Sequence, residues 1–146
     1  MTTALDVAKY FLFKASEDND LLSNLKLQKL VYYAQGLFLA ETGSPLFSEK
    51  VEAWTYGPVI PDLYHNYKNH GADAIPVDPI FKPNTITPEI RSFLDEIYTV
   101  FGQFSGPRLI EISHSDDCWS EDIVGNVITH EEMAKALKRY IKNGQE

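Results

Sequence analysis

The stretch of this sequence richest in reactive side chains is Ser113-His114-Ser115-Asp116-Asp117. A histidine beside hydroxyls and carboxylates is the set of groups with which hydrolases activate a nucleophile. Such groups work only when they converge in space, and side chains of sequence neighbours point in different directions. We therefore favour a structural interpretation, in which His114 makes a buried or half-buried hydrogen bond and Ser115 or Asp116 caps a turn. The alternative is a small hydrolase that uses His114 with Asp116 or Asp117.

The histidines and glycines give no recognisable cofactor pattern. His65 and His70 are five residues apart, so they do not share a helix face as an i, i+4 pair would. The chain has no HExxH motif, and its single cysteine, Cys118, excludes a site built from several thiolates. Its glycines form neither a GxGxxG motif nor a P-loop. We expect no metal and no other cofactor.

Composition narrows the class of protein. The 146 residues are 44% hydrophobic and 12% aromatic, which is ample for the core of one domain. The net charge of −8 repels phosphate backbones and disfavours broad nucleic-acid binding. One cysteine fits a reducing compartment, and there is neither a signal peptide nor an apolar run of about 20 residues that could span a membrane. We expect a cytoplasmic protein.

The elements that must position these groups are mainly helices. Apolar spacing and capping residues predict a mainly α fold of about six helices with a small β element after the central helix. The predicted helices cover about residues 4–15, 25–41, 58 or 61 to 71, 88–104, a stretch from 107 and 129–142. Prolines exclude a helix between Ala72 and Thr87. The apolar residues of that connector should lie on the core: Ile75, Val77, Ile80 and Phe81.

The central helix, from about Leu25 to Glu41, carries polar residues beside a predicted buried stripe. The stripe has helical spacing and consists of Leu27, Leu30, Val31, Ala34 and Phe38. Lys26 and Lys29 lie off it, where they either remain solvated or meet acidic groups of a partner. Tyr32 and Tyr33 flank it, and each can bury its ring while its hydroxyl reaches a polar partner.

A short strand follows the central helix. Residues alternate from Val51 to Thr55, and Tyr56-Gly57-Pro58 then breaks the pattern. Because Pro58 restricts the residue before it and glycine alone reaches positive φ without a Cβ clash, we predict a tight turn at Gly57 that leads into the next helix.

Four aromatic residues are candidates for binding: Trp54, Tyr56, Tyr64 and Trp119. Aromatic side chains dominate binding hot spots, but they also fill cores. We expect Trp54 to pack in the core, and an aromatic ring can also be buried on one side and presented on the other.

Three segments, KLQKLVYYAQ, EAWTYGPVIPDLY and SHSDDCW, together resemble the Panacea antitoxin domain, a family that includes SocA-like and phage-associated proteins. The resemblance runs in order from Leu5 to about Ile141. Its most specific part is Ala53-Trp54-x-Tyr56-Gly57-Pro58-Val59 with Tyr64 downstream. One departure is Cys118, because the family usually has proline before the second tryptophan.

The resemblance implies a single domain over residues 1–146, without a separate DNA-binding domain. It implies a non-enzymatic antitoxin that binds and neutralises a cognate toxin, which the adjacent gene usually encodes, and it allows delivery of the toxin to a protease or unfoldase. A mobile-element protein that modulates a host factor is a further alternative. The candidate partner-binding or family-motif residues are Lys26, Lys29, Tyr32, Tyr33, Trp54, Tyr56, Gly57, Pro58, Tyr64, His114 and Trp119.

Overall fold

The structure is a computed structural model that describes residues 2–141. Within that range, the α-helices are α1 (Ala4–Glu17), α2 (Asn24–Thr42), α3 (Pro61–Tyr67), α4 (Pro88–Phe101), α5 (Gly106–His114) and α6 (His130–Leu137). Single 3-10 turns are η1 (Lys68–His70), η2 (Pro83–Thr85), η3 (Glu121–Ile123) and η4 (Lys138–Tyr140). Strands β1 (Val51–Trp54), β2 (Gly57–Val59) and β3 (Val127–Ile128) form an antiparallel sheet in the order β2-β1-β3. The predicted mainly α fold with a small β element is confirmed.

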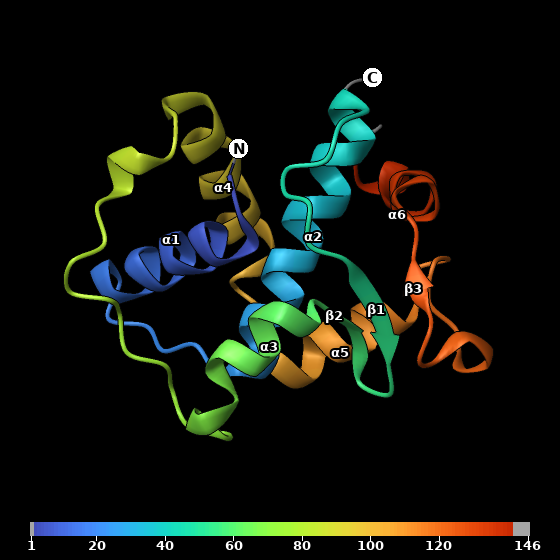
Figure 1. The fold of residues 1–146 in the computed structure, drawn as a ribbon, viewed down its shortest axis with the longest axis horizontal. Coiled ribbons are helices and arrows are strands. Elements are labelled where there is room, and N and C mark those ends of the chain that lie inside the picture. The colour runs from blue at the N-terminus through green and yellow to red at the C-terminus, as the bar shows by residue number, and fades with distance from the viewer. Residues whose placement is uncertain (1, 142–146) are drawn as a thin grey trace.

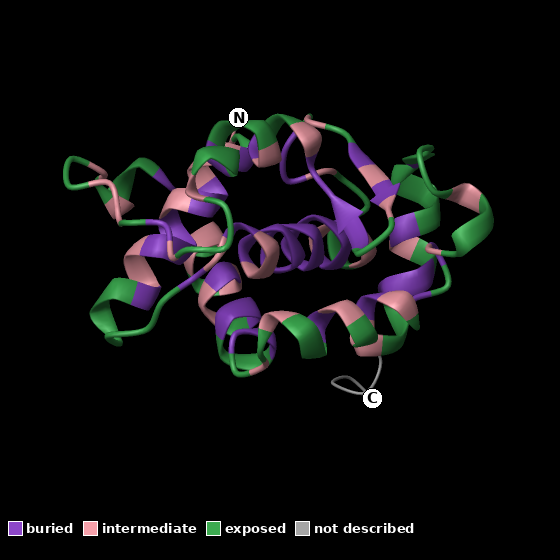
Figure 2. Ribbon diagram, turned by 90° about the horizontal axis from the view of Figure 1, so that it is seen from below, coloured by how far each residue is buried: buried purple, intermediate pink, exposed green. Residues whose placement is uncertain are grey.

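Helix α2 is the centre of the molecule. Helices α1 and α4 lie on one side of it, and α6 and the sheet lie on the other (Figure 1). Figure 2 shows the central helix as buried along most of its length. The predicted one-sided stripe was therefore too narrow, because neighbours cover every face of α2. Gly36 permits the approach of α6, since a methyl group there would collide with Leu137 Cδ1.

Local sequence signals set the helix ends. The Ser23 hydroxyl accepts a hydrogen bond from the Lys26 N–H and caps α2, and Gly43 ends that helix at a φ of 80°. Thr3 and Thr129 form the capping boxes that begin α1 and α6. The predicted end of the last helix at residues 143–144 lies outside the described residues.

The turn at Gly57 differs from its prediction in one respect. Gly57 lies at the predicted turn and has a positive φ of 107°. It does not lead directly into a helix, however, because it begins β2, which pairs with β1 through Trp54 opposite Gly57 and Ala53 opposite Pro58. Pro58 is tolerated there because β2 is an edge strand. Helix α3 begins only at Pro61, the second of the two prolines proposed for that role.

The proline-rich connector packs less completely than predicted. Ile75 is buried and Phe81 packs against the core, but Ile80 is 80% exposed. The physical reason is a turn at Asp78, whose side-chain oxygen accepts the Ile80 N–H and whose carbonyl accepts the Phe81 N–H. Ile80 therefore lies at the tip of that turn, and residues 79–81 form no strand. None of the helices between residues 2 and 141 has the length and apolar character needed to cross a bilayer.

Candidate partner-binding site

The carboxylate of Asp116 is a structural anchor. Its Oδ2 accepts hydrogen bonds from the hydroxyls of Tyr32 and Tyr33 at 2.9 and 2.8 Å. Its Oδ1 accepts from Arg139 Nη2 at 2.7 Å and from the Tyr140 hydroxyl at 3.0 Å. Burial raises the pKa of Asp116, although these four hydrogen bonds favour the ionised form. The predicted burial of both tyrosine rings with bonded hydroxyls is confirmed, and Arg139 and Tyr140 are partners that the sequence did not reveal.

Cys118, the departure from the family pattern, belongs to the same buried cluster. Its sulfur lies 3.1 Å from the Tyr32 hydroxyl oxygen, and burial raises the pKa of its thiol to about 11. A thiol held protonated in this way is a poor nucleophile. The structure therefore gives Cys118 a packing role beneath the turn that leads to Trp119.

His114 packs against the β-hairpin that β1 and β2 form over residues 51–59. Its Nε2 lies 3.1 Å from the Thr55 carbonyl oxygen, and its ring stacks on Trp119 with centroids 3.9 Å apart. Trp119 Nε1 in turn donates to the Trp54 carbonyl oxygen at 2.9 Å. The predicted half-buried hydrogen bond of His114 is present.

The arrangement that the hydrolase alternative requires is not formed. The hydroxyls of Ser113 and Ser115 donate to backbone carbonyls in the last turn of α5. The Asp116 carboxylate is taken up by tyrosines and Arg139, as described above. Among the described residues, the His114 ring contacts the Thr55 carbonyl oxygen and Trp119, and not a hydroxyl or a carboxylate. Likewise, no group of three or more metal-ligating side chains exists among the residues that the structure describes.

The two lysines of α2 point inward. Lys29 is fully buried, its ammonium donates to the Pro58 carbonyl oxygen at 3.2 Å, and burial lowers its pKa to about 7. Lys26 is partly buried, and its ammonium donates to the Gly102 carbonyl oxygen at 2.7 Å. The interpretation of Lys29 as a solvated or partner-binding residue was wrong, because the hairpin covers that face of α2.

Two buried amides join α2 to the start of α3. Gln28 Oε1 accepts the Ile60 N–H at 2.9 Å, and Gln28 Nε2 donates to Asn24 Oδ1 at 3.0 Å. Asn24 Nδ2 then donates to the Tyr64 carbonyl oxygen at 3.3 Å. Neither amide was singled out from the sequence, although their i, i+4 spacing on one helix is a signal that could have identified them.

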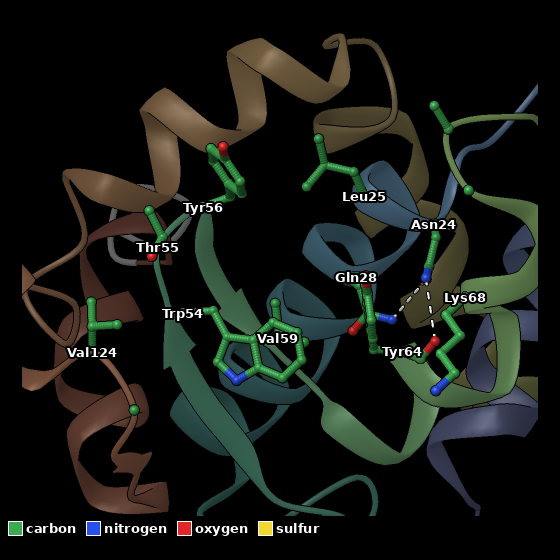
Figure 3. A pocket seen from close by; sticks show the side chains of 13 residues that line it. Asn24, Leu25, Gln28, Trp54, Thr55, Tyr56, Val59, Tyr64, Lys68 and Val124 are labelled. Carbon is green, nitrogen blue, oxygen red and sulfur yellow. Dashed lines mark hydrogen bonds between the residues drawn. The ribbon is translucent and has the colours of Figure 1, made fainter.

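An open pocket of about 590 Å³ lies between α2, the hairpin and α3 (Figure 3). Its walls contain three aromatic residues of the family motif, Trp54, Tyr56 and Tyr64. The remaining lining residues are Asn24, Leu25, Gln28, Thr55, Val59, Lys68, Gly71, Ala72, Val124 and Gly125. The volume is within the roughly 300–1,000 Å³ of typical ligand pockets.

Trp54 was predicted to pack in the core, but it lies in the wall of the pocket. Val51 and Ala53 are buried in the core, so strand alternation places Trp54 on the other face of β1, where it is half-buried. Its ring meets Tyr64 edge to face with centroids 5.0 Å apart, and its Nε1 donates to Glu52 Oε1 at 3.0 Å. The indole is thus held in place with an apolar surface toward the pocket.

The pocket rim is exposed and apolar. Tyr56 is 64% exposed and Val124 is 42% exposed. Of the candidate residues, the structure brings Trp54, Tyr56 and Tyr64 together at this surface. The others lie behind it: His114 and Trp119 brace the hairpin, Gly57 and Pro58 are buried within it, and the α2 residues pack inside.

The sequence reasoning missed several lining residues. Lys68 follows Tyr64 by four residues and could have been recognised by that spacing. Val124 arrives from the segment between α5 and β3, and no local pattern marks it.

Comparison with known proteins agrees with the three sequence segments. The family described as "Antitoxin SocA-like, Panacea domain" matches residues 27–120, which include most of α2, the hairpin, α3 and the segment up to Trp119. Antitoxin SocA of Caulobacter vibrioides (strain NA1000 / CB15N) is 31% identical over 132 residues, which cover 82% of this chain and 69% of that protein. No solved structure matches this chain. The chain belongs to the SocA-like antitoxin family with a Panacea domain.

Proposed function

We propose that this protein is an antitoxin that neutralises a protein toxin by binding it directly, with the aromatic pocket as the centre of the contact. Its family and its similarity to antitoxin SocA support the antitoxin role. The observation that carries the choice of surface is the position of Trp54, Tyr56 and Tyr64, which come from β1, its turn and α3 and line one open pocket.

The geometry of the pocket suits a protein partner. Trp54 and Tyr64 hold each other edge to face, so little side-chain freedom is lost when a partner binds. Tyr56 and Val124 extend the apolar surface beyond the pocket, and a small molecule inside the pocket would leave them exposed. Aromatic residues with a surrounding rim are the usual form of an interface hot spot.

Co-expression with the adjacent gene tests this proposal, because we expect that gene to encode the toxin. The wild-type protein should restore growth of cells that express the neighbouring product. A Tyr56→Ala, Val124→Ser double variant should fail to do so, because it removes apolar contact surface from the pocket and its rim. Both residues are exposed, so the fold should stay intact.

The matched control is Ile80→Ser, which removes an exposed apolar side chain from the connector after α3. It should restore growth as the wild type does. If the double variant also restores growth at the same expression level, the pocket is not the toxin-binding surface.

A further inference from the structure

The pocket is chemically asymmetric (Figure 3). At the hairpin end it presents apolar surface from Trp54, Tyr56 and Val59. At the α3 end it presents Lys68 beside Tyr64 and Asn24, with Gln28 next to them. An occupant of the whole pocket therefore meets two different chemical environments.

The polar groups at the α3 end are hydrogen-bond donors. The side-chain amide of Asn24 uses one N–H for the Tyr64 carbonyl, and that of Gln28 uses one for Asn24 Oδ1. Both amides are buried, so they shape the pocket floor and leave Lys68 as the exposed donor. Lys68 has three N–H donors, it is exposed, and among residues 2–141 it takes part in no ion pair. The matching group on a partner is an acceptor, and a carboxylate is the strongest one that proteins supply.

The charge around this end is unusual for the chain. The whole protein carries a net charge of −8, yet the described lining of the pocket includes no carboxylate and Lys68 is its only charged side chain. A basic side chain drawn to the acidic surface would find no partner inside the pocket. Charge complementarity at this point selects an acidic group.

We propose that the pocket binds a partner-protein segment in which an aromatic or large aliphatic side chain is followed closely by a carboxylate. The apolar anchor lies against Trp54 and Val59, and the carboxylate pairs with the exposed Lys68. This inference rests on the proposed function, because it names the chemistry of the toxin segment that the pocket recognises.

Short peptides test the inference without the toxin. The probes are acetylated and amidated serine-flanked peptides that contain Phe and Asp separated by zero, one or two serines. Matched peptides replace Asp by Asn or Lys, or Phe by Ala. The two indole N–H signals of the protein report binding by NMR, since Trp54 lines the pocket and Trp119 does not.

The expected result is a shift of the Trp54 signal, with a Phe–Asp peptide binding about three- to fivefold tighter than its Asn counterpart, as for a partly exposed ion pair. Replacing Phe by Ala should abolish the shift. Lys68→Glu should reverse the preference, so that the Lys peptide binds more tightly than the Asp peptide. The control is Lys82→Glu, which reverses the charge of an exposed lysine just before η2. It should leave the wild-type preference unchanged.

Equal affinity for the Asp and Asn peptides at every spacing would overturn the inference. Oligouridylate is a second probe, because aromatic side chains can also stack on RNA bases. A shift of the Trp54 signal by oligouridylate and not by the peptides would likewise overturn it. Failure here is distinguishable from failure of the proposed function. If Tyr56→Ala, Val124→Ser loses the growth rescue while the peptides show no acidic preference, the toxin-binding surface stands and the acidic segment is wrong. If the peptides discriminate but that double variant still rescues growth, the antitoxin surface lies elsewhere.

Discussion

The Tyr33 hydroxyl donates a 2.8 Å hydrogen bond to the carboxylate of Asp116, which lies 83 residues later in the sequence. The same carboxylate accepts from Tyr32 on α2 and from Tyr140 in η4. One buried acid therefore joins the central helix to the segment after α5 and to the end of the described chain.

Replacing Asp116 should destabilise the fold strongly. In Asp116→Ala, the hydroxyls of Tyr32 and Tyr33 lose their buried acceptor, and Arg139 loses its counter-charge. A buried hydroxyl that loses its partner costs about 1–3 kcal/mol, whereas Arg139 is half exposed and is re-solvated by water, so it adds less. Urea unfolding should show that loss. Asp117 is the exposed neighbour, so Asp117→Ala should change the free energy of unfolding by less than about 0.5 kcal/mol; equal effects of the two changes would refute the anchoring role.

Lys29 should make the stability depend on pH. Its pKa is about 7 in the folded protein, against 10.5 for an ordinary lysine. Between these values the unfolded chain holds a proton that the folded chain does not, so the free energy of unfolding rises with pH. The rise approaches about 1.4 kcal/mol per pH unit for this one group.

The measurement compares the wild type with Lys29→Met by urea unfolding at about pH 7.5, 8.5 and 9.5. Tyrosines and Cys118 are present in both proteins, so their titration cancels in the comparison. The wild type should gain on the variant as pH rises. Lys82→Met, at an exposed lysine, should instead follow the wild type. Parallel pH curves for wild type and Lys29→Met would show that the buried ammonium keeps its proton.

Gly57→Ala should cost more than a positive φ alone explains. A Cβ at Gly57 would lie 2.5 Å from Ser113 Oγ and 2.8 Å from Lys29 Cε. Backbone strain of about 1–2 kcal/mol adds to overpacking of about 1–3 kcal/mol. Gly125 provides the control, because its φ is 98° but a Cβ there meets nothing within 4 Å. Gly125→Ala should show the backbone strain alone. Similar losses in thermal unfolding at both sites would mean that Ser113 and Lys29 move away from the new Cβ at residue 57 without a loss of stability.

Trp54→Ala should destabilise less than a core change. A fully buried tryptophan loses about 3–5 kcal/mol when truncated to alanine, but Trp54 is half-buried and its main aromatic contact is Tyr64. We expect a loss of about 1–2 kcal/mol in chemical unfolding. The Trp119 indole still finds the residue-54 backbone carbonyl, so the hairpin should stay braced. A loss of about 3–5 kcal/mol would instead show that Trp54 contributes to stability as a core residue does.

Local chemistry made part of the fold predictable. Ser23 and Gly43 delimit α2 through a side-chain cap and a left-handed residue, both of which are properties of a few adjacent residues. The break in the strand at Gly57-Pro58 was predicted in the same way, because a proline disfavours the helical region for the residue before it and glycine alone reaches a positive φ without a Cβ clash.

Long-range packing was not predictable from those signals. Lysine is usually a surface residue, and Lys29 is buried because the hairpin packs over α2. Strand β3 has two residues, too few for a periodic pattern, and it exists because it pairs with β1. At the candidate site, the motif identified Trp54, Tyr56 and Tyr64, but Val124 joins them only through the tertiary fold.

The affinity of the neighbouring gene product for this protein tests the central claim most directly. Isothermal titration calorimetry should be run on the wild type, Tyr56→Ala and Ile80→Ser, with the melting temperature of each recorded. We predict a Kd at least about tenfold weaker for Tyr56→Ala, as for a hot-spot aromatic, with the melting temperature and the Ile80→Ser affinity unchanged. An unchanged Kd for Tyr56→Ala would contradict the account.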